Sequence, residues 1–245
     1  MNKCAVVIPI YKKELSKFEW TNLKISLQNL IDHDVYIIAP EHLNLAFVLN
    51  KLGKIKIKQF DDKSFSSISN YSKLMLSKEF FSRFNDYSHI LICQTDAIVI
   101  RQDLQHWLDQ PYDYIGAPWP NGYELTIKTK HIPLPEGIKC KTYVGNGGLS
   151  LRRIVGCTNL MDEFEDIHNE WINHGHAEDL FYGLVGYLST EFRLPNVITA
   201  ANFSHETEPD FMYSLIGNKL PFGAHGFDKY PNKNLEKFIS DFKLT

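Results

Sequence analysis

Apolar and polar positions along the first hundred residues predict strands and helices in turn. Continuous apolar runs or two-residue alternation, both typical of strands, cover residues 4–10, 35–39, 55–60 and 89–93. Apolar residues at helical spacing predict helices over residues 15–31 and 69–84. Because strands that alternate with helices usually build a parallel sheet with crossover helices, this half of the chain predicts an α/β fold.

The pattern is less regular after residue 100. The segment 121–141 is polar and rich in Pro, Gly and Lys without a helical period, which predicts an excursion from the sheet such as a hairpin or a lid. The other expected elements are helices over 102–108, about 158–174 and 235–242, an apolar helical stretch over 180–188, and strands over 112–117 and 144–152. Since no repeat or linker interrupts the chain, we expect a single domain.

Composition narrows the class of protein. The 245 residues include 26 Lys and Arg against 29 Asp and Glu, a net charge of −3 that gives no electrostatic reason to expect a nucleic-acid partner. No apolar run approaches the ~20 residues of a membrane span, so we expect a soluble cytoplasmic protein. The four cysteines fit neither a zinc site nor a disulfide scaffold, and we expect small buried thiols in a reducing compartment: Cys4, Cys93, Cys140 and Cys157.

A polar trio, Gln94, Thr95 and Asp96, interrupts two apolar runs. In parallel α/β sheets ligands bind beyond the carboxyl ends of the strands, where a carboxylate would face the cleft. A partly buried Asp needs a compensating metal, Arg or backbone donor. Ligand binding by Asp96 and a simple turn-capping role both remain open at this point.

A glycine-rich run, VGNGGLS over residues 144–150, permits close approach of the backbone to a ligand. It follows no first strand and opens no helix, so it is not a dinucleotide-binding fingerprint. A bulge or tight bend would use the same glycines.

Two further motifs carry groups capable of chemistry. In HGHAEDLF, Glu178 and Asp179 precede an apolar helical stretch, where a carboxylate serves either as a helix cap or as a general base. His174 and His176 have a spacing that a pair of metal ligands could use, although loop histidines are more often solvated. In PFGAHGF, His225 is flanked by glycines and is a competent metal ligand as a neutral imidazole.

The ordered motifs LICQTDAIVI, YIGAPW, VGNGGLSLR, AEDLFYG and AHGF resemble those of GT-A-fold glycosyltransferases. The sequence looks closest to an uncharacterised bacterial and fungal domain family to which sugar transfer is attributed, which also carries the helix motif seen here as NYSKLMLSKEFF. GNGGLSLR and EDLFYG are more distantly similar to motifs of β-1,3-galactosyltransferase and fringe-type enzymes. The resemblance implies a GT-A-like single domain over residues 1–245, with a mainly parallel central sheet flanked by helices and a small antiparallel element.

The resemblance also assigns roles along the chain. Residues 1–100 would form a nucleotide-binding half, 101–230 an acceptor-binding half, and 231–245 a C-terminal helix and tail. Donor or nucleotide binding falls to Pro9, Tyr11, Asp61, Lys73, Gln94, Thr95 and Asp96. Donor-sugar or acceptor binding falls to Trp119, Asn146, Gly147 and Gly148, although Trp119 would serve equally well in the core.

The implied reaction is transfer of a hexose from a nucleotide-sugar, with UDP the expected nucleotide, to a glycan acceptor. Charge that develops on the leaving diphosphate requires a cation, and oxygen ligands suit Mn²⁺ or Mg²⁺. Asp96 matches the last carboxylate of the family's DxD motif and His225 its C-terminal metal ligand, whereas Gln94 replaces the first Asp and puts tight metal dependence in doubt. Asp179, with Glu178 as the alternative, matches the base of inverting relatives.

Lipopolysaccharide or capsule synthesis in bacteria is the implied setting. Lysines at 12, 13 and 17 and at 229, 233 and 237 are either ordinary solvated residues or a contact with the inner face of the plasma membrane. Two rival functions remain. A non-catalytic carbohydrate-binding protein is favoured by Gln94, whereas a sugar-1-phosphate nucleotidyltransferase is disfavoured because the segment after the first strand has no glycine. The sequence does not indicate an oligomeric state.

Overall fold

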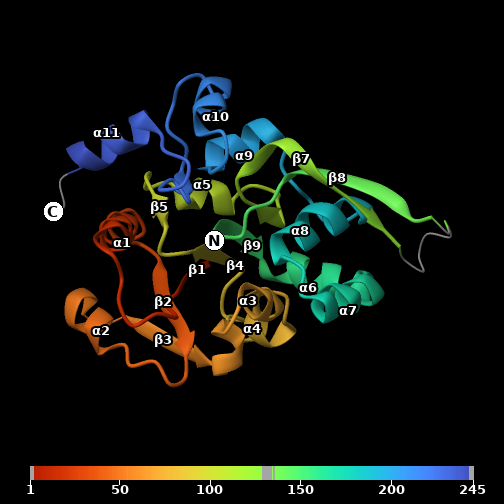
Figure 1. Cartoon of the computed structure of the whole chain (residues 1–245), viewed down its shortest axis with the longest axis horizontal. Coiled ribbons are helices and arrows are strands. Elements are labelled where there is room, and N and C mark those ends of the chain that lie inside the picture. The colour runs from red at the N-terminus through yellow and green to blue at the C-terminus, as the bar shows by residue number, and fades with distance from the viewer. Residues whose placement is uncertain (1–2, 54, 129–133, 135, 243–245) are drawn as a thin grey trace.

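A six-stranded sheet forms the centre of the molecule (Figure 1), in a computed structural model that describes residues 3–53, 55–128, 134 and 136–242. The strand order is β3-β2-β1-β4-β9-β6. The first four strands in this order are parallel, and β9 runs antiparallel to both of its neighbours. The strand bounds are β1 Cys4–Pro9, β2 Asp34–Pro40, β3 Lys56–Phe60, β4 His89–Cys93, β6 Tyr114–Ile115 and β9 Leu149–Arg153. The mainly parallel α/β sheet expected from the sequence is confirmed.

Alternate residues of β1 belong to two separate hydrophobic clusters. Ala5 and Val7 pack in the cluster that includes side chains of α3, α4, α6 and α7. Val6 and Ile8 pack in the cluster that includes α1, α2 and α5. The central strands are therefore buried on both faces, which explains their continuous apolar sequences. The helix bounds are α1 Lys17–Asn29, α2 Ala46–Leu52, α3 Ile68–Met75, α4 Lys78–Ser82, α5 Leu104–Leu108, α6 Ile154–Glu163 and α7 Glu165–His174.

Two of the helices expected from the sequence are each divided in the structure. The segment 69–84 forms α3 and α4, because the Ser77 hydroxyl accepts a hydrogen bond from the Phe80 amide at 3.1 Å and starts a new helix. The segment 158–174 forms α6 and α7, which meet at the non-helical Phe164. Helices α2, α9 (Val197–Phe203) and α10 (Pro209–Leu215) were not predicted; each has only seven residues, too few for a clear period.

A three-stranded sheet and a hairpin complete the strands. The small sheet has the order β10-β11-β5, with bounds Ser204–His205, Gly223–His225 and Ala97–Val99. The expected excursion is an antiparallel hairpin of β7, Pro118–Ile127, and β8, Ile138–Val144. Residues 129–133 and 135 of that excursion lie outside the described residues.

The strand expected over 144–152 begins only at Leu149, because residues 145–148 form a loop in which Asn146 has a φ of 64°. The expected apolar helix over 180–188 is broken into α8, Glu178–Leu180, a π-helical turn, Phe181–Val185, and a 3-10 turn, Gly186–Leu188.

The last helix of the chain, α11 (Lys233–Asp241), lies beside α1 (Figure 1). This amphipathic helix packs its apolar residues with Phe18 and Ile25 of α1. No helix among the described residues is long and apolar enough to cross a membrane. The division into a nucleotide-binding part (1–100), an acceptor-binding part (101–230) and a C-terminal helix and tail (231–245) stays a prediction. Residues 1–2 and 243–245 of these parts lie outside the described residues.

Candidate functional site

A cavity of about 350 Å³ lies beyond the carboxyl ends of the neighbouring parallel strands β1 and β4. This is the edge at which open α/β sheets bind ligands. Its lining residues are Pro9, Tyr11, Lys12, Ser16, Phe18, Glu19, Gln94, Thr95, Asp96, Asp228 and Lys229. The structure thus brings together five residues that the sequence singled out for donor binding, from segments about 85 positions apart.

Backbone hydrogen bonds tie the Gln94-Thr95-Asp96 loop to the two later motifs. The Gln94 amide donates to the Gly148 carbonyl at 2.9 Å, and the Gly226 amide donates to the Asp96 carbonyl at 3.2 Å. The Thr95 hydroxyl is already engaged, because it donates to Glu19 Oε1 at 2.5 Å. Three motifs distant in the sequence are therefore held together beside the cavity, and the Gln94-Thr95-Asp96 loop lines it.

Asp96, His225 and Glu206 lie in a row beside this edge. Asp96 Oδ1 is 3.2 Å from His225 Nε2, and Glu206 Oε1 is 3.2 Å from His225 Nδ1. Burial alone lowers the pKa of His225, but the two carboxylates raise it to about 9. Burial alone raises the pKa of Asp96, but the contact with His225 brings it below the ordinary value.

Asp96 and His225 suit a divalent cation in donor type and spacing. Two neighbouring ligands of an octahedral ion with bonds of ~2.1 Å are about 3 Å apart, close to the separation of Oδ1 and Nε2. Within the described part of the chain, both buried ring nitrogens of His225 lack a well-formed hydrogen bond. Among the same residues, no three His, Cys, Asp or Glu side chains converge as a ready-made metal site. The protein offers two ligands, which is the number expected where substrate phosphates supply others.

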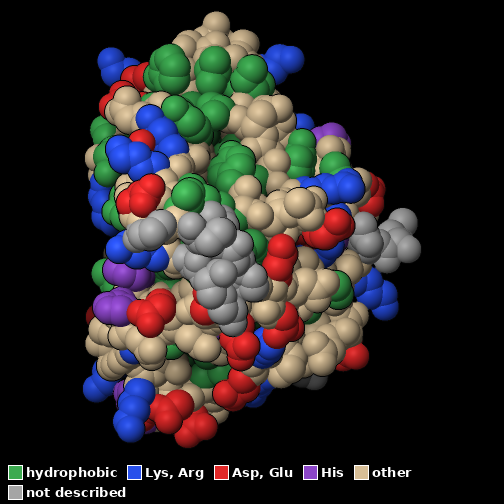
Figure 2. All heavy atoms as spheres, turned by 90° about the vertical axis from the view of Figure 1, so that its right-hand side faces the viewer, with side chains coloured by type: hydrophobic (Ala, Val, Ile, Leu, Met, Phe, Trp, Pro, Cys, Tyr) green, Lys and Arg blue, Asp and Glu red, His purple; other side chains and the backbone are tan. Residues whose placement is uncertain are grey.

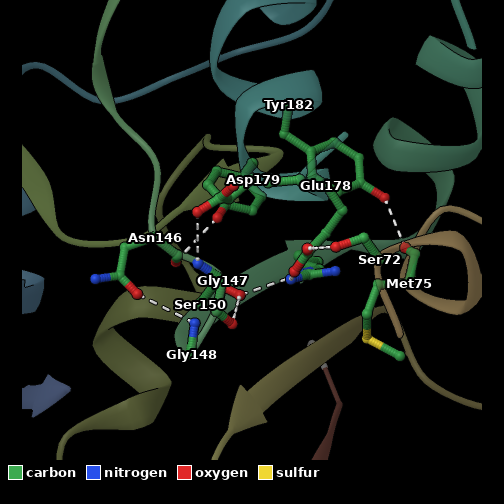
Figure 3. A network of polar contacts seen from close by, with 12 residues as sticks. Ser72, Met75, Asn146, Gly147, Gly148, Ser150, Glu178, Asp179 and Tyr182 are labelled. Carbon is green, nitrogen blue, oxygen red and sulfur yellow. Dashed lines mark hydrogen bonds and ion pairs between the residues drawn. The ribbon is translucent and has the colours of Figure 1, made fainter. Parts of the chain in front are cut away.

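The glycine-rich loop brings the backbone against the side chains of His225 and Glu178. A Cβ on Gly148 would lie 2.1 Å from His225 Nε2, and one on Gly147 would lie 2.3 Å from Glu178 Oε1. The Asn146 side-chain oxygen accepts a hydrogen bond from the Gly148 amide at 3.1 Å (Figure 3). Its Nδ2 is buried and, among the described residues, has no hydrogen-bond partner, so it is a donor available to a ligand.

Glu178 and Asp179 have different partners in the structure (Figure 3). Glu178 is buried and pairs with Arg152 Nη2 at 3.0 Å, while the Ser72 hydroxyl donates to its other oxygen at 3.0 Å. Asp179 accepts hydrogen bonds from the amides of Gly147, at 3.2 Å, and Leu180, at 2.8 Å. Burial and the charge of Glu178 raise the pKa of Asp179 to about 7. A carboxylate with that pKa is suited to exchange a proton near neutral pH.

The remaining expected residues lie outside the 350 Å³ cavity lining. Trp119 is half-buried, and its ring rests on Gly145, where a Cβ would lie 1.9 Å from the indole. Asp61 is exposed and caps the turn Asp62–Phe65 by accepting from the Lys63 amide at 2.7 Å. Lys73 is on α3 beside Gly175.

His174 and His176 stack on each other, with ring centroids 5.7 Å apart, and both line a groove of about 1020 Å³ between the β7–β8 hairpin and α7. The hairpin end of the molecule carries acidic and basic side chains interspersed with apolar ones (Figure 2).

Sequence reasoning missed Glu206 and Arg152. Glu206 follows a two-residue strand in an irregular segment, so no pattern marked it. Arg152 carried a signal that was available, since a lysine or arginine that ends a buried strand is rarely left without an acidic partner.

Comparisons with known proteins identify the family and the fold of the chain. Residues 54–225 match the model of a family described as a protein of unknown function (DUF5672). No curated protein matches the sequence significantly.

The fold is similar to the apo form of mouse xyloside xylosyltransferase 1, with a TM-score of 0.55 and 14% identity over 94% of this chain and 99% of that one. It is also similar to an active-site mutant of LgtC, with a TM-score of 0.54 and 14% identity over 96% of this chain and 94% of that one. For galactosyltransferase LgtC in complex with donor and acceptor sugar analogues, the TM-score is 0.51 and the identity 11%, over 98% of this chain and 96% of that one. At these identities the likeness concerns the fold, and it confirms the GT-A-like architecture. The chain therefore belongs to the DUF5672 family and has the GT-A-like fold of glycosyltransferases.

Proposed function

We propose that this protein is a nucleotide-sugar-dependent glycosyltransferase that transfers a hexose to a glycan acceptor with the help of a divalent cation. The observation that carries the proposal is the junction of three loops at one cavity. Asp96 and His225 lie 3.2 Å apart at its edge, and Gly147 and Gly148 connect them to Asp179.

The cavity beyond β1 and β4 would hold the nucleoside, with UDP the expected nucleotide. Tyr11 is 56% exposed there, which leaves its ring free to stack on a base. Lys12 and Lys229 also line the cavity and place positive charge near a bound diphosphate. Asp96 and His225 would hold Mn²⁺ or Mg²⁺, which when bound neutralises the charge on the leaving diphosphate.

The donor sugar would lie against the glycine-rich loop. Asn146 Nδ2 is available to donate a hydrogen bond to the sugar. The half-buried Trp119 lies beside Gly145 of the same loop. Asp179 would remove the proton from the acceptor hydroxyl, because its raised pKa of about 7 suits a general base. Attack from the face opposite the diphosphate gives a single displacement with inversion at the anomeric carbon.

The groove of about 1020 Å³ is the proposed acceptor entrance. Leu180, which lines it, directly follows Asp179, and Tyr123 links it to Trp119 with ring centroids 6.0 Å apart. We retain as part of the proposal that the acceptor is a bacterial surface glycan made on the cytoplasmic side of the membrane.

Calorimetry with UDP-, GDP-, CMP- and dTDP-sugars, with and without Mn²⁺, tests the function. We expect one donor class to bind in a Mn²⁺-dependent way, and Asp96→Ala to abolish this binding. Asp162→Ala, which removes an exposed carboxylate of α6 that pairs with Lys78, is the matched control and should bind normally.

Failure of every donor to bind would contradict the proposal, and glycan binding without nucleotide would favour the carbohydrate-binding alternative suggested by Gln94. For an active donor, NMR of the product should show the inverted anomer. A retained anomer would contradict the role given to Asp179.

A further inference from the structure

The small sheet places three ionisable residues side by side: Glu206 directly follows β10, His225 ends β11, and Asp96 directly precedes β5. β10 and β11 are parallel with His205 opposite Ala224, so the next pair in register is Glu206 and His225. β11 and β5 are antiparallel with His225 opposite Ala97, so Asp96 lies one residue away. Backbone pairing, rather than side-chain flexibility, thus fixes the order Glu206, His225, Asp96.

The imidazole of His225 is held from both sides. Nε2 faces Asp96 at 3.2 Å and Nδ1 faces Glu206 at 3.2 Å, with the three side chains between 12% and 29% exposed. Gly148 packs directly against the ring, since a Cβ there would overlap its Nε2, Cδ2 and Cε1 atoms. The ring therefore has little freedom to rotate, and each nitrogen has one defined neighbour.

A histidine that binds a cation through one ring nitrogen must carry its proton on the other. A carboxylate that accepts this N–H fixes the tautomer and the ring plane, and makes the ligand more basic. Glu206 is placed to do this at Nδ1, so that a cation that takes the place of the Nε2 proton would meet the lone pair of Nε2 next to Asp96.

We propose that Glu206 is a positioning residue of the cation site: its carboxylate orients His225 so that Nε2 and Asp96 Oδ1 together receive the divalent cation. This inference rests on the proposed function for the identity of the cation as Mn²⁺ or Mg²⁺. It assigns Glu206 a role through His225, with no contact of its own to the sugar or the diphosphate.

The first test measures Mn²⁺ affinity by calorimetry in the absence of any nucleotide-sugar. Glu206→Ala should weaken Mn²⁺ binding by about 10–100-fold, the usual effect of losing such a partner. Glu206→Gln should fall between Glu206→Ala and the wild type, because the amide oxygen still accepts the Nδ1 proton but lacks the charge. Glu208→Gln, an exposed carboxylate two residues away, is the matched control and should bind as the wild type does.

The second test is one that general destabilisation would not imitate. With ¹⁵N-labelled histidine and saturating Mg²⁺, which would take the place of the Nε2 proton, NMR should show His225 of the wild type protonated at Nδ1, and Glu206→Ala should lose this preference. The His225 signals are assigned by their loss in His225→Gln.

The inference would be overturned if the wild type bound no Mn²⁺, if both Glu206 variants bound it like the control, or if the tautomer were unchanged in Glu206→Ala. Sugar-donor turnover of the wild type is measured separately and bears only on the proposed function.

Discussion

Asp179 and Glu178 are adjacent in the sequence but have opposite surroundings. The charge of Glu178 is balanced by Arg152 at 3.0 Å. Among the described residues, Asp179 accepts hydrogen bonds from the backbone amides of Gly147 and Leu180, and it lies in the field of Glu178 and Glu206. Both carboxylates lie next to Gly147, but that of Glu178 pairs with the buried Arg152 whereas that of Asp179 accepts the Gly147 amide. The sequence named both candidates for the base, and the surroundings favour Asp179.

The pH dependence of turnover should report on Asp179. A general base works only when deprotonated, so kcat/KM should rise with pH with an apparent pKa of about 7, and Asp179→Asn should lose transfer while donor binding persists. Because the native pKa lies above the ordinary value, this group favours folding at acidic pH, and that contribution is lost as the pH rises through 7. Asp179→Asn should therefore unfold at a higher temperature than the wild type at pH 8. A pH-independent rate, or equal melting temperatures at pH 8, would contradict this assignment.

Gly148→Ala should impair donor binding through the site itself, an effect that can be distinguished from a loss of fold stability. The added Cβ would meet the His225 ring at 2.1 Å and displace it, so we expect loss of Mn²⁺-dependent donor binding. Gly217→Ala is the control, because its Cβ would meet nothing within 4 Å and its φ of +74° makes it costly for stability alone. Calorimetry and thermal melting of both variants provide the comparison. Normal donor binding by Gly148→Ala would show that His225 is not held as the structure indicates.

At the scale of elements, one buried ion pair joins three segments. Arg152 belongs to β9, Glu178 to α8, and Ser72, which donates to Glu178, to α3. This set holds the start of α8, and hence Asp179, against the glycine-rich loop. Element types in the sheet could be predicted because buried strands carry continuous apolar sequence. The breaks at Ser77 and Phe164 could not, since a local cap or dihedral angle decides them against an uninterrupted apolar period.

Glu178→Gln should cost stability rather than only activity. Removing one partner leaves the buried Arg152 charge uncompensated, which typically costs about 3–5 kcal/mol in the free energy of unfolding. Urea unfolding at pH 8 should therefore separate Glu178→Gln from Asp179→Asn, which we expect to be at least as stable as the wild type. The double variant Arg152→Met, Glu178→Gln should recover part of the loss. Wild-type stability of Glu178→Gln would refute the structural role of this pair.

At the scale of the whole molecule, the fold gathers charged side chains from distant segments around one cavity, both basic (Lys12, Lys229) and acidic (Glu19, Asp96, Asp228). Lys12 and Lys229 come from opposite ends of the chain, yet they line one cavity because α11 packs across α1. The net charge of −3 gives no sign that basic side chains meet at one place. The structure adds two lysines to that cavity, although Lys12 also pairs with Glu19 at 2.5 Å.

The thiols report on the integrity of the whole fold. All four cysteines are free and buried, as the sequence predicted, and burial raises the pKa of each thiol, that of Cys93 to about 12. The native protein should therefore react slowly with a thiol reagent such as dithionitrobenzoate, and four thiols should react in denaturant. Rapid reaction of any cysteine under native conditions would contradict the packing of the strand or helix that carries it.

The sequence by itself determined the α/β class, the central strands, the hairpin and the motifs that contain the candidate site. These features depend on local patterns, since burial on both faces demands apolar runs and tight loops demand glycine. Only the tertiary structure decided which groups meet: Glu206 with His225, Arg152 with Glu178, and Lys12 with Lys229. The two ion pairs, with atoms 3.0 and 3.2 Å apart, and the shared cavity of the lysines depend on how strands and helices distant in the chain are arranged, which leaves no periodic trace in the sequence.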